Sequence, residues 1–309
     1  MPSGRYDPAS AGTFEVSTQA GEAEDEARGI TFPIDIWAPA GRGAGSSPLV
    51  LFSHYSGGDR RKSSFLCGHL ASHGYVVAAL DHSEIVDPRL ARRDGETPAE
   101  RKGRVDAIIA SRVPDVRFLL DHVLARGSAI DASRIGIVGH SFGGWTALAA
   151  PESDRRICSI VALAPGGSER PRPGIIPSKL TFDWGRAVPV MFVAAENDVP
   201  VPLQNVVEVF DRAPSPKRLF VLRRADHQHF VDDVEGEHEA VRAATFPGES
   251  AWIPAATRPV AELMSGEDAH RIVRALTLAH FDATLRGNVA AGGFLDTVAT
   301  SEREFVYGG

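Results

Sequence analysis

RIGIVGHSFGGW (residues 134–145) begins as an apolar, β-branched run and then turns sharply at a G-x-S-x-G motif. Residues 145–150, which follow, are typical of the start of a helix. Strand, tight turn and helix in this order predict a nucleophile elbow, in which a serine occupies a strained turn. Gly139 and Gly143 fit such a turn, because a side chain at either position would clash with the neighbouring backbone. Ser141 is therefore the candidate nucleophile.

Segments of strand length recur on both sides of this stretch and alternate with helical patterns. The expected buried strands are residues 49–53, 75–80, 157–163, 188–194 and 218–222. The expected helices are residues 64–73, 113–124, 203–210 and 268–286, with Gly127 ending the second. This alternation is typical of a mostly parallel central sheet flanked by helices, so we predict an α/β fold.

Three other parts of the chain have weaker patterns. Residues 13–17 and 30–37 alternate apolar with polar side chains and are expected to be antiparallel edge strands, joined by an acidic hairpin loop at 22–26. Residues 83–110 form a polar, Arg-rich excursion. Residues 232–264 are acidic and poorly periodic.

Composition limits the classes of partner. With 43% hydrophobic and 24% charged residues, the 309-residue chain is typical of a globular protein. The net charge of -7 is mild and the arginines are scattered, so we expect neither a nucleic-acid partner nor membrane insertion. The N-terminus lacks a basic segment followed by an apolar one, and Cys67 and Cys158 are expected to be free thiols. These features predict a cytoplasmic protein.

Three candidate catalytic groups follow the C-terminal ends of predicted strands. They occur in the order Ser141, Asp198, His227, which is the α/β-hydrolase order. A serine hydroxyl needs an imidazole to take its proton, and a carboxylate must hold that imidazole in the right tautomer. We therefore predict a Ser-His-Asp triad.

Each partner of the serine has competitors. Asp198 follows the 188–194 strand, but it also precedes two prolines and could be a structural aspartate in a turn. Asp183 and Asp226 are weaker rivals for the acid. His229 lies two residues from His227 and competes for the base. His54 and His140 are expected to pack or orient, because no spacing among the histidines indicates a metal site. We expect no cofactor.

A tetrahedral intermediate also needs backbone N–H donors. One is expected from Phe142, the residue after the nucleophile. The second is expected from the loop after Phe52, with Ser56 preferred over Tyr55. Tyr55 and Trp145 are the candidate substrate-binding side chains.

Five segments carry a resemblance to a known family: PLVLFSH (48–54), LASHGYVVAA (70–79), PDVRFLLD (114–121), GHSFGG (139–144) and DHQHF (226–230). In them the chain resembles the serine α/β-hydrolases grouped as predicted dienelactone hydrolases. Through these it resembles platelet-activating-factor acetylhydrolases and, more distantly, bacterial polyester hydrolases. The resemblance implies Ser141 as nucleophile, Asp198 as acid and His227 as base, since the family's histidine stands three residues before a Phe.

Two positions depart from the family pattern. Tyr55 stands where the family usually has Gly after the first-loop histidine, although the register still places the donor at Ser56. Polyester hydrolases carry a Trp after the strand that follows the elbow, where this chain has PGG (165–167). A dienelactone substrate does not follow, because dienelactone hydrolases use a Cys nucleophile.

The sequence therefore predicts a metal-independent serine carboxylic-ester hydrolase acting on a small or medium ester through an acyl-enzyme. The same triad could cleave an amide, a thioester, a phospholipid acyl group or a polyester, and a hydrolase fold can also bind without catalysis. We expect a single α/β-hydrolase domain over residues 13–309, with a flexible tail at 1–12 and no large cap. Residues 232–262 are expected to lie over the mouth of the site and limit substrate size.

Overall fold

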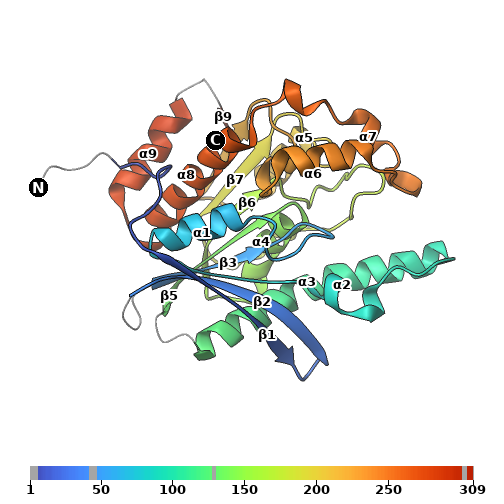
Figure 1. The fold of residues 1–309 in the computed structure, drawn as a ribbon, viewed down its shortest axis with the longest axis horizontal. Helices are drawn as coiled ribbons and strands as arrows, with labels where there is room; N and C mark the ends of the chain where they lie inside the picture. The colour runs from blue at the N-terminus through green and yellow to red at the C-terminus, as the bar shows by residue number, and fades with distance from the viewer. Residues whose placement is uncertain (1–5, 42–46, 127–129, 301–304, 309) are drawn as a thin grey trace, which may run out of the picture.

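A nine-stranded sheet runs through the described part of the chain, residues 6–41, 47–126, 130–300 and 305–308 of a computed structural model (Figure 1). Its order is β1-β2-β4-β3-β5-β6-β7-β8-β9. The strands are β1 (Val16–Asp25), β2 (Ile30–Pro39), β3 (Ser47–Ser53), β4 (Val76–Leu80), β5 (Ile130–His140), β6 (Ile157–Leu163), β7 (Val190–Ala195), β8 (Lys217–Leu222) and β9 (Phe305–Gly308). Strands β3 to β8 pair in parallel, while β1, β2 and β9 pair antiparallel to their neighbours. The predicted α/β-hydrolase fold is confirmed.

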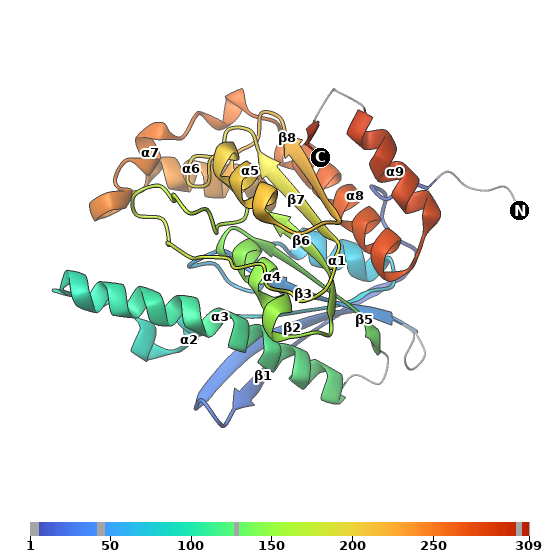
Figure 2. The same cartoon turned by 180° about the vertical axis from the view of Figure 1, so that it is seen from behind.

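Helices cover both faces of this sheet (Figures 1 and 2). One face carries α3 (Pro98–Arg126), α4 (Phe142–Ser153) and α5 (Leu203–Arg212), and the other carries α1 (Ser64–Ser72), α8 (Gly266–Leu285) and α9 (Val289–Thr300). Successive side chains of a strand point to opposite faces, so a strand covered on both sides must be apolar throughout. In β3, Leu49 and Leu51 enter one core and Val50 and Phe52 enter the other.

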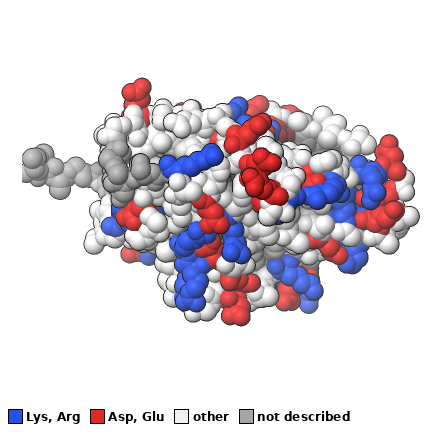
Figure 3. Space-filling view, turned by 90° about the horizontal axis from the view of Figure 1, so that it is seen from below, with Lys and Arg blue, Asp and Glu red and all other residues white. Residues whose placement is uncertain are grey.

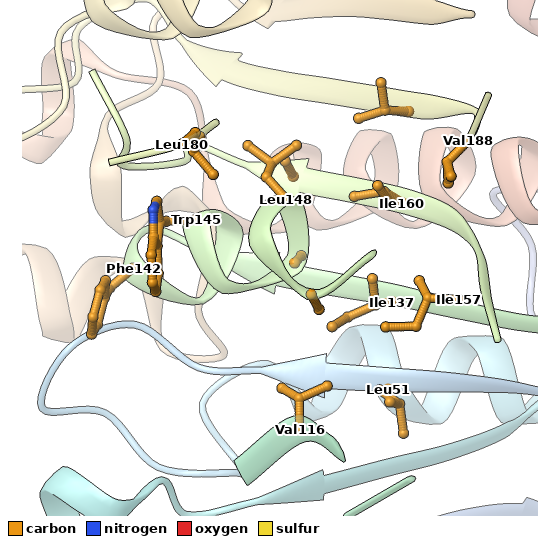
Figure 4. Packing of buried hydrophobic residues seen from close by; sticks show 14 of the residues in the cluster. Leu51, Val116, Ile137, Phe142, Trp145, Leu148, Ile157, Ile160, Leu180 and Val188 are labelled. Atoms are coloured by element: carbon orange, nitrogen blue, oxygen red, sulfur yellow. The ribbon is translucent and has the colours of Figure 1, made fainter. Parts of the chain in front are cut away.

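The core on the α4 side holds the elbow helix against the sheet. Figure 4 shows Ile137 and Ile160 from the strands facing Leu148 of α4, and Val116 of α3 near Leu51 of β3. Leu148 is fully buried. Truncating such a leucine to alanine costs about 2–5 kcal/mol of unfolding free energy, so this packing fixes where α4 begins.

The hairpin at the sheet edge differs from the prediction. β1 continues through residues 22–25, and the turn lies at 26–29, so the acidic loop predicted at 22–26 is wrong. Ala23 is the buried side chain of β1 and most of the others are exposed. Backbone pairing with β2, rather than burial, therefore keeps these acidic residues extended.

The Arg-rich excursion is largely helical. It contains α2 (Ser83–Val86), the short 3-10 helix η1 (Pro88–Leu90) and the first part of α3, which begins at Pro98. Residues 98–107 bury no side chain, so they have no apolar stripe that would indicate a helix. The predicted stop at Gly127 lies outside the described residues.

The acidic stretch after β8 is also built of short helices. They are η2 (His227–Phe230), α6 (Val234–Ala243), η3 (Gly248–Ser250), α7 (Ile253–Ala256) and η4 (Val260–Glu262). They lie beyond the C-terminal ends of the parallel strands (Figure 1). We call residues 232–262 the lid segment. The sequence also did not anticipate α9 or β9.

The N-terminal segment is docked where the structure describes it. His69 Nε2 bonds the carbonyl oxygen of Pro8 at 2.9 Å, and Gly12 N donates to Ser72 Oγ at 2.9 Å. A Cβ atom on Gly12 would lie 2.0 Å from the carbonyl oxygen of Ser72, so the chain needs glycine to approach α1 this closely. Residues 6–12 of the predicted flexible tail thus lie against α1, residues 1–5 lie outside the described part, and the flexibility of the tail stays a prediction.

Charged side chains of both signs are mixed over the face in Figure 3. No broad area of one sign appears on that face, which agrees with the scattered arginines of the sequence. Within the described ranges, no helix combines the length and the apolar character needed to span a bilayer.

Candidate active site

Three side chains from three loops meet beyond the C-terminal ends of the strands. Ser141 follows β5, Asp198 follows β7 and His227 opens η2 after β8. His227 Nε2 lies 2.8 Å from Ser141 Oγ, and His227 Nδ1 lies 2.7 Å from Asp198 Oδ2. The structure thus brings together the three residues predicted as nucleophile, base and acid.

The elbow places Ser141 in a strained conformation. Its φ of 59° and ψ of -116° lie in a region that residues with a side chain rarely adopt. The surrounding backbone fixes this turn: a Cβ on Gly139 would lie 2.1 Å from Gly143 O, and a Cβ on Gly143 would lie 2.0 Å from Ser53 O. The motif glycines therefore let α4, β5 and the loop after β3 approach one another.

Asp198 is held by two hydrogen bonds. Besides His227, the backbone N–H of Val201 donates to Asp198 Oδ1 at 2.7 Å. The rival Asp183 is exposed, and its backbone N–H lies against Glu152, away from this site. The other rival, Asp226, accepts from Gln228 N and contacts His229 instead.

The competing histidine is engaged elsewhere. His229 Nδ1 lies 2.9 Å from Asp226 N and 3.0 Å from Asp226 Oδ1, and its Nε2 bonds Met264 O at 3.0 Å. His229 is fully buried and joins η2 to the start of α8. Its ring therefore fixes the loop that carries His227.

Burial and charge act in opposite directions on the base. Burial alone lowers the pKa of His227, but the charge and hydrogen bond of Asp198 outweigh it and the net pKa is raised. Burial raises the pKa of the Asp198 carboxyl, against the opposing effect of His227 and the Val201 N–H. The arrangement favours proton transfer from Ser141 to His227, because the ion pair that results stays in contact.

Two predicted orienting histidines lie beside the site. His54 Nε2 accepts from the N–H of His82 at 3.0 Å, so its Nδ1 donates to Tyr55 O at 2.7 Å. His140 packs with its ring centroid 4.7 Å from that of His227. Burial is the largest cause that keeps the pKa of both rings well below the ordinary value, and both are therefore neutral.

The candidate oxyanion residues line one cavity with the nucleophile. Phe142 is the first residue of α4, where backbone N–H groups have no partner within the helix. Ser56 lies in the loop after β3. Both residues line the cavity that contains Ser141.

The two predicted substrate-binding side chains are not in the lining of that cavity. The Trp145 ring is buried, stacks on Phe142 with centroids 5.2 Å apart and donates from Nε1 to Lys179 O. Tyr55 packs edge-on against His140. Both rings are used in packing that supports Phe142 and the base, and a role of either in binding substrate stays a prediction.

The cavity has a volume of about 300 Å³ and a largely apolar wall. The lid segment contributes to it, as expected, through Phe246, Ser250 and Ile253. The remaining lining residues come from the loops after β3, β5, β6 and β7: Ser56, Ser141, Phe142, Gly166, Gly174, Ile175, Ile176, Ser178, Pro200 and Val201. The residues that line the cavity come from five separate loops, so local sequence patterns could not predict them.

Arg112 of α3 was not among the predicted residues, and its side chain is fully buried beside the site. Its Nη1 donates to His54 O at 2.7 Å, and its Nε donates to Glu84 at 2.7 Å. A signal was present, because Arg112 interrupts the apolar stripe of α3 four residues from both Ile108 and Val116. A charged residue on a buried face indicates a buried partner.

No group of three or more His, Cys, Asp or Glu side chains within the described ranges is arranged to hold a metal ion.

The PET hydrolase-like family model matches residues 2–243. The chain belongs to this family. Named relatives of this PET hydrolase-like chain include platelet-activating factor acetylhydrolase of Cavia porcellus, 25% identical over 221 residues covering 60% of the chain and 48% of that protein. Bis(hydroxyethyl) terephthalate hydrolase of Streptomyces coelicolor is 25% identical over 150 residues, covering 48% and 38%. The predicted resemblance is confirmed.

A third relative is chlorophyllase-1 of Citrus sinensis, 27% identical over 162 residues that cover 52% of the chain and 45% of that protein. The chain thus spans about half the length, or less, of these relatives. A solved structure of a ferulic acid esterase from Streptomyces cinnamoneus has a TM-score of 0.62 at 22% identity, covering 92% of this chain and 94% of that one. This likeness shows a shared fold.

Proposed function

We propose that this PET hydrolase-like chain is a serine ester hydrolase that acts through an acyl-enzyme. The observation that carries the proposal is the unbroken hydrogen-bond chain from Asp198 through His227 to Ser141, at the wall of a cavity. A serine in this arrangement has a base for its proton and a carboxylate to stabilise the charged base.

In the proposed reaction, Ser141 Oγ attacks the ester carbonyl carbon while its proton passes to His227 Nε2. The oxyanion of the tetrahedral intermediate accepts hydrogen bonds from the N–H groups of Phe142 and Ser56. Collapse breaks the bond to the alcohol, which leaves with the proton of His227. Water then attacks the acyl-enzyme by the same route and releases the carboxylic acid.

The cavity favours a small or medium ester. About 300 Å³ accommodates a short acyl or alcohol group against Ile175, Ile176 and Ile253. Relatives named acetylhydrolase, terephthalate hydrolase and cutinase favour an ester over an amide or a thioester. Phospholipid acyl and polyester substrates, and binding without catalysis, are the alternative proposals. The cytoplasmic location stays a prediction, with Cys67 and Cys158 free.

The test is labelling with a fluorophosphonate, followed by kinetics on p-nitrophenyl esters of increasing chain length. We expect wild-type protein to be labelled at Ser141 and to prefer short chains. Ser141→Ala should lose labelling and lower kcat by roughly 10⁴–10⁶-fold with an unchanged melting temperature. Unreduced turnover in Ser141→Ala would remove this residue from the mechanism, and wild-type protein that neither labels nor turns over would favour a binding role.

A further inference from the structure

The buried guanidinium of Arg112 contacts both segments that carry the proposed oxyanion donors, the loop after β3 and the start of α4. The guanidinium of Arg112 forms an ion pair with Glu84 of α2, with Nε and Nη2 directed at the two carboxylate oxygens. Its Nη1 donates to His54 O at 2.7 Å, and its Nη2 lies 3.4 Å from Tyr55 O. The same guanidinium lies 4.3 Å from the centroid of the Phe142 ring.

The contacts to the two carbonyls determine where the next N–H groups point. In a trans peptide, the C=O of one residue and the N–H of the next point in opposite directions. Holding the carbonyls of His54 and Tyr55 toward Arg112 therefore turns the N–H groups of Tyr55 and Ser56 away from it. Of these two residues, Ser56 lines the cavity with Ser141.

The Tyr55 carbonyl is held a second time by His54. His54 Nδ1 donates to Tyr55 O at 2.7 Å, while the backbone N–H of His82 fixes the other ring nitrogen. Behind this ring, His82 bonds Ser53 Oγ at 2.8 Å and Asp115 at 3.1 Å. The side chains of His54, His82, Ser53 and Asp115 are all buried, so the loop after β3 is supported by a polar network beneath it rather than by solvent.

Arg112 also contacts the second segment, the start of α4, through the ring of Phe142. The guanidinium of Arg112 lies over this ring, and the indole of Trp145 stacks with the ring. Phe142 carries the N–H that follows the nucleophile. Arg112 thus couples the N-terminus of α4 to the loop after β3, two elements far apart in the sequence.

We propose that Arg112, anchored by Glu84, is a positioning residue that sets the distance and direction of the two oxyanion donors. The proposal rests on the proposed ester hydrolysis and adds a residue to it. Arg112 acts through the backbone of Tyr55 and Ser56 and through Phe142, without touching the substrate. Its removal should weaken stabilisation of the transition state more than binding of the ester.

The first test is Arg112→Lys, which keeps the charge beside Glu84 but lacks the planar fork that reaches both carbonyls. We expect kcat on p-nitrophenyl acetate to fall at least tenfold, with KM changed less than threefold. The Ki of a trifluoromethyl ketone, whose serine adduct carries an oxyanion, should rise by a similar factor. The acid limb of the pH profile should stay in place, because His227 is not moved.

A second variant removes both charges. Glu84→Gln combined with Arg112→Met leaves no unpaired buried ion, and kcat should fall roughly 10²-fold, the scale of losing one oxyanion donor. The matched control is Glu96→Gln with Arg104→Met, which removes a bidentate ion pair between Arg104 of α3 and Glu96 in the turn before this helix. This control should retain wild-type kcat and Ki.

The outcomes separate this inference from the proposed function. Wild-type protein that hydrolyses esters through Ser141, together with a folded Arg112→Lys variant within threefold of its kcat, overturns the positioning role alone. A Ki for the ketone that stays constant while KM rises also overturns it, because that pattern indicates a damaged cavity. Wild-type protein without any ester hydrolysis overturns the proposed function first.

Discussion

His227 Nδ1 lies 2.7 Å from Asp198 Oδ2, and both side chains are buried. The contact raises the pKa of His227 above its ordinary value of about 6.5, even though burial acts against the charged ring. The carboxylate therefore does more than orient the imidazole, since it also sets the pH below which the base is lost.

The first prediction concerns this pH. A protonated imidazole cannot accept the serine proton, so kcat/KM should fall as the pH decreases through the pKa of His227, with a midpoint above about 6.5. A pH series of kcat/KM on p-nitrophenyl acetate measures it. A midpoint clearly below 6.5 would show that burial, rather than Asp198, dominates.

The second prediction tests the acid. Asp198→Asn should lower kcat by roughly 10⁴-fold, because the amide favours the wrong imidazole tautomer. Asp183→Asn is the control, since Asp183 is exposed and has no contact with His227. Greater damage from Asp183→Asn would place the acid on another loop.

The third prediction separates the two histidines. His227→Ala should abolish the titrating activity and leave only a residual rate from the oxyanion donors. His229→Ala should keep the acid limb, with a loss of a few-fold and a lower melting temperature, because its ring bonds Met264 O and the N–H of Asp226. An active His227→Ala beside an inactive His229→Ala would reverse the two assignments.

The fourth prediction concerns the lid segment. Ile253→Ala enlarges the cavity beside Ser141, and kcat/KM for a longer acyl chain, relative to acetate, should rise by roughly tenfold. Val260→Ala lies in the same segment but not in the cavity lining, so it serves as the control. Identical chain-length profiles for wild type and Ile253→Ala would show that the lid segment does not limit substrate size.

The fifth prediction concerns the elbow. Gly143→Ala places a Cβ 2.0 Å from Ser53 O, so α4 or the loop after β3 must move, and both activity and the melting temperature should fall. Gly103→Ala, in the exposed first part of α3 with no atom of another segment within 4 Å of the added Cβ, should instead stabilise the fold by roughly 0.5–1 kcal/mol. Thermal melts of the two variants compare them directly.

The sequence predicted the elbow because its requirements are local. The motif residues Gly139, Ser141 and Gly143 and the apolar run of β5 all lie within one short stretch, and the atom that a Cβ on Gly139 would meet, Gly143 O, lies there too. The parallel strands were predicted for a similar reason, since burial on both faces demands continuous apolar segments such as residues 49–52. The three candidate catalytic residues could then be found, because each comes shortly after the C-terminal end of a predicted strand.

Features that depend on distant contacts were missed or misplaced. β1 and the first part of α3 are exposed, so no apolar period marks them. The stacking of Trp145 on Phe142 and its hydrogen bond to Lys179 O could not be predicted, because no local pattern shows these partners. Arg112 and its partner Glu84 are 28 residues apart, and only the fold brings them to the same loop.

The lid segment is tied to the loop that carries the base. His238 Nδ1 of α6 lies 2.7 Å from Asp226 Oδ2, immediately before His227 in the chain, and its Nε2 bonds Arg258 O at 2.7 Å. Lys62 bonds Glu237 of α6 at 2.5 Å, which links the lid segment to the loop between β3 and α1. A chimera that replaced the whole segment with that of a relative would therefore disturb the catalytic loop. Exchange limited to residues 244–256 would leave these anchors in place, which makes that stretch the natural unit for transplanting selectivity.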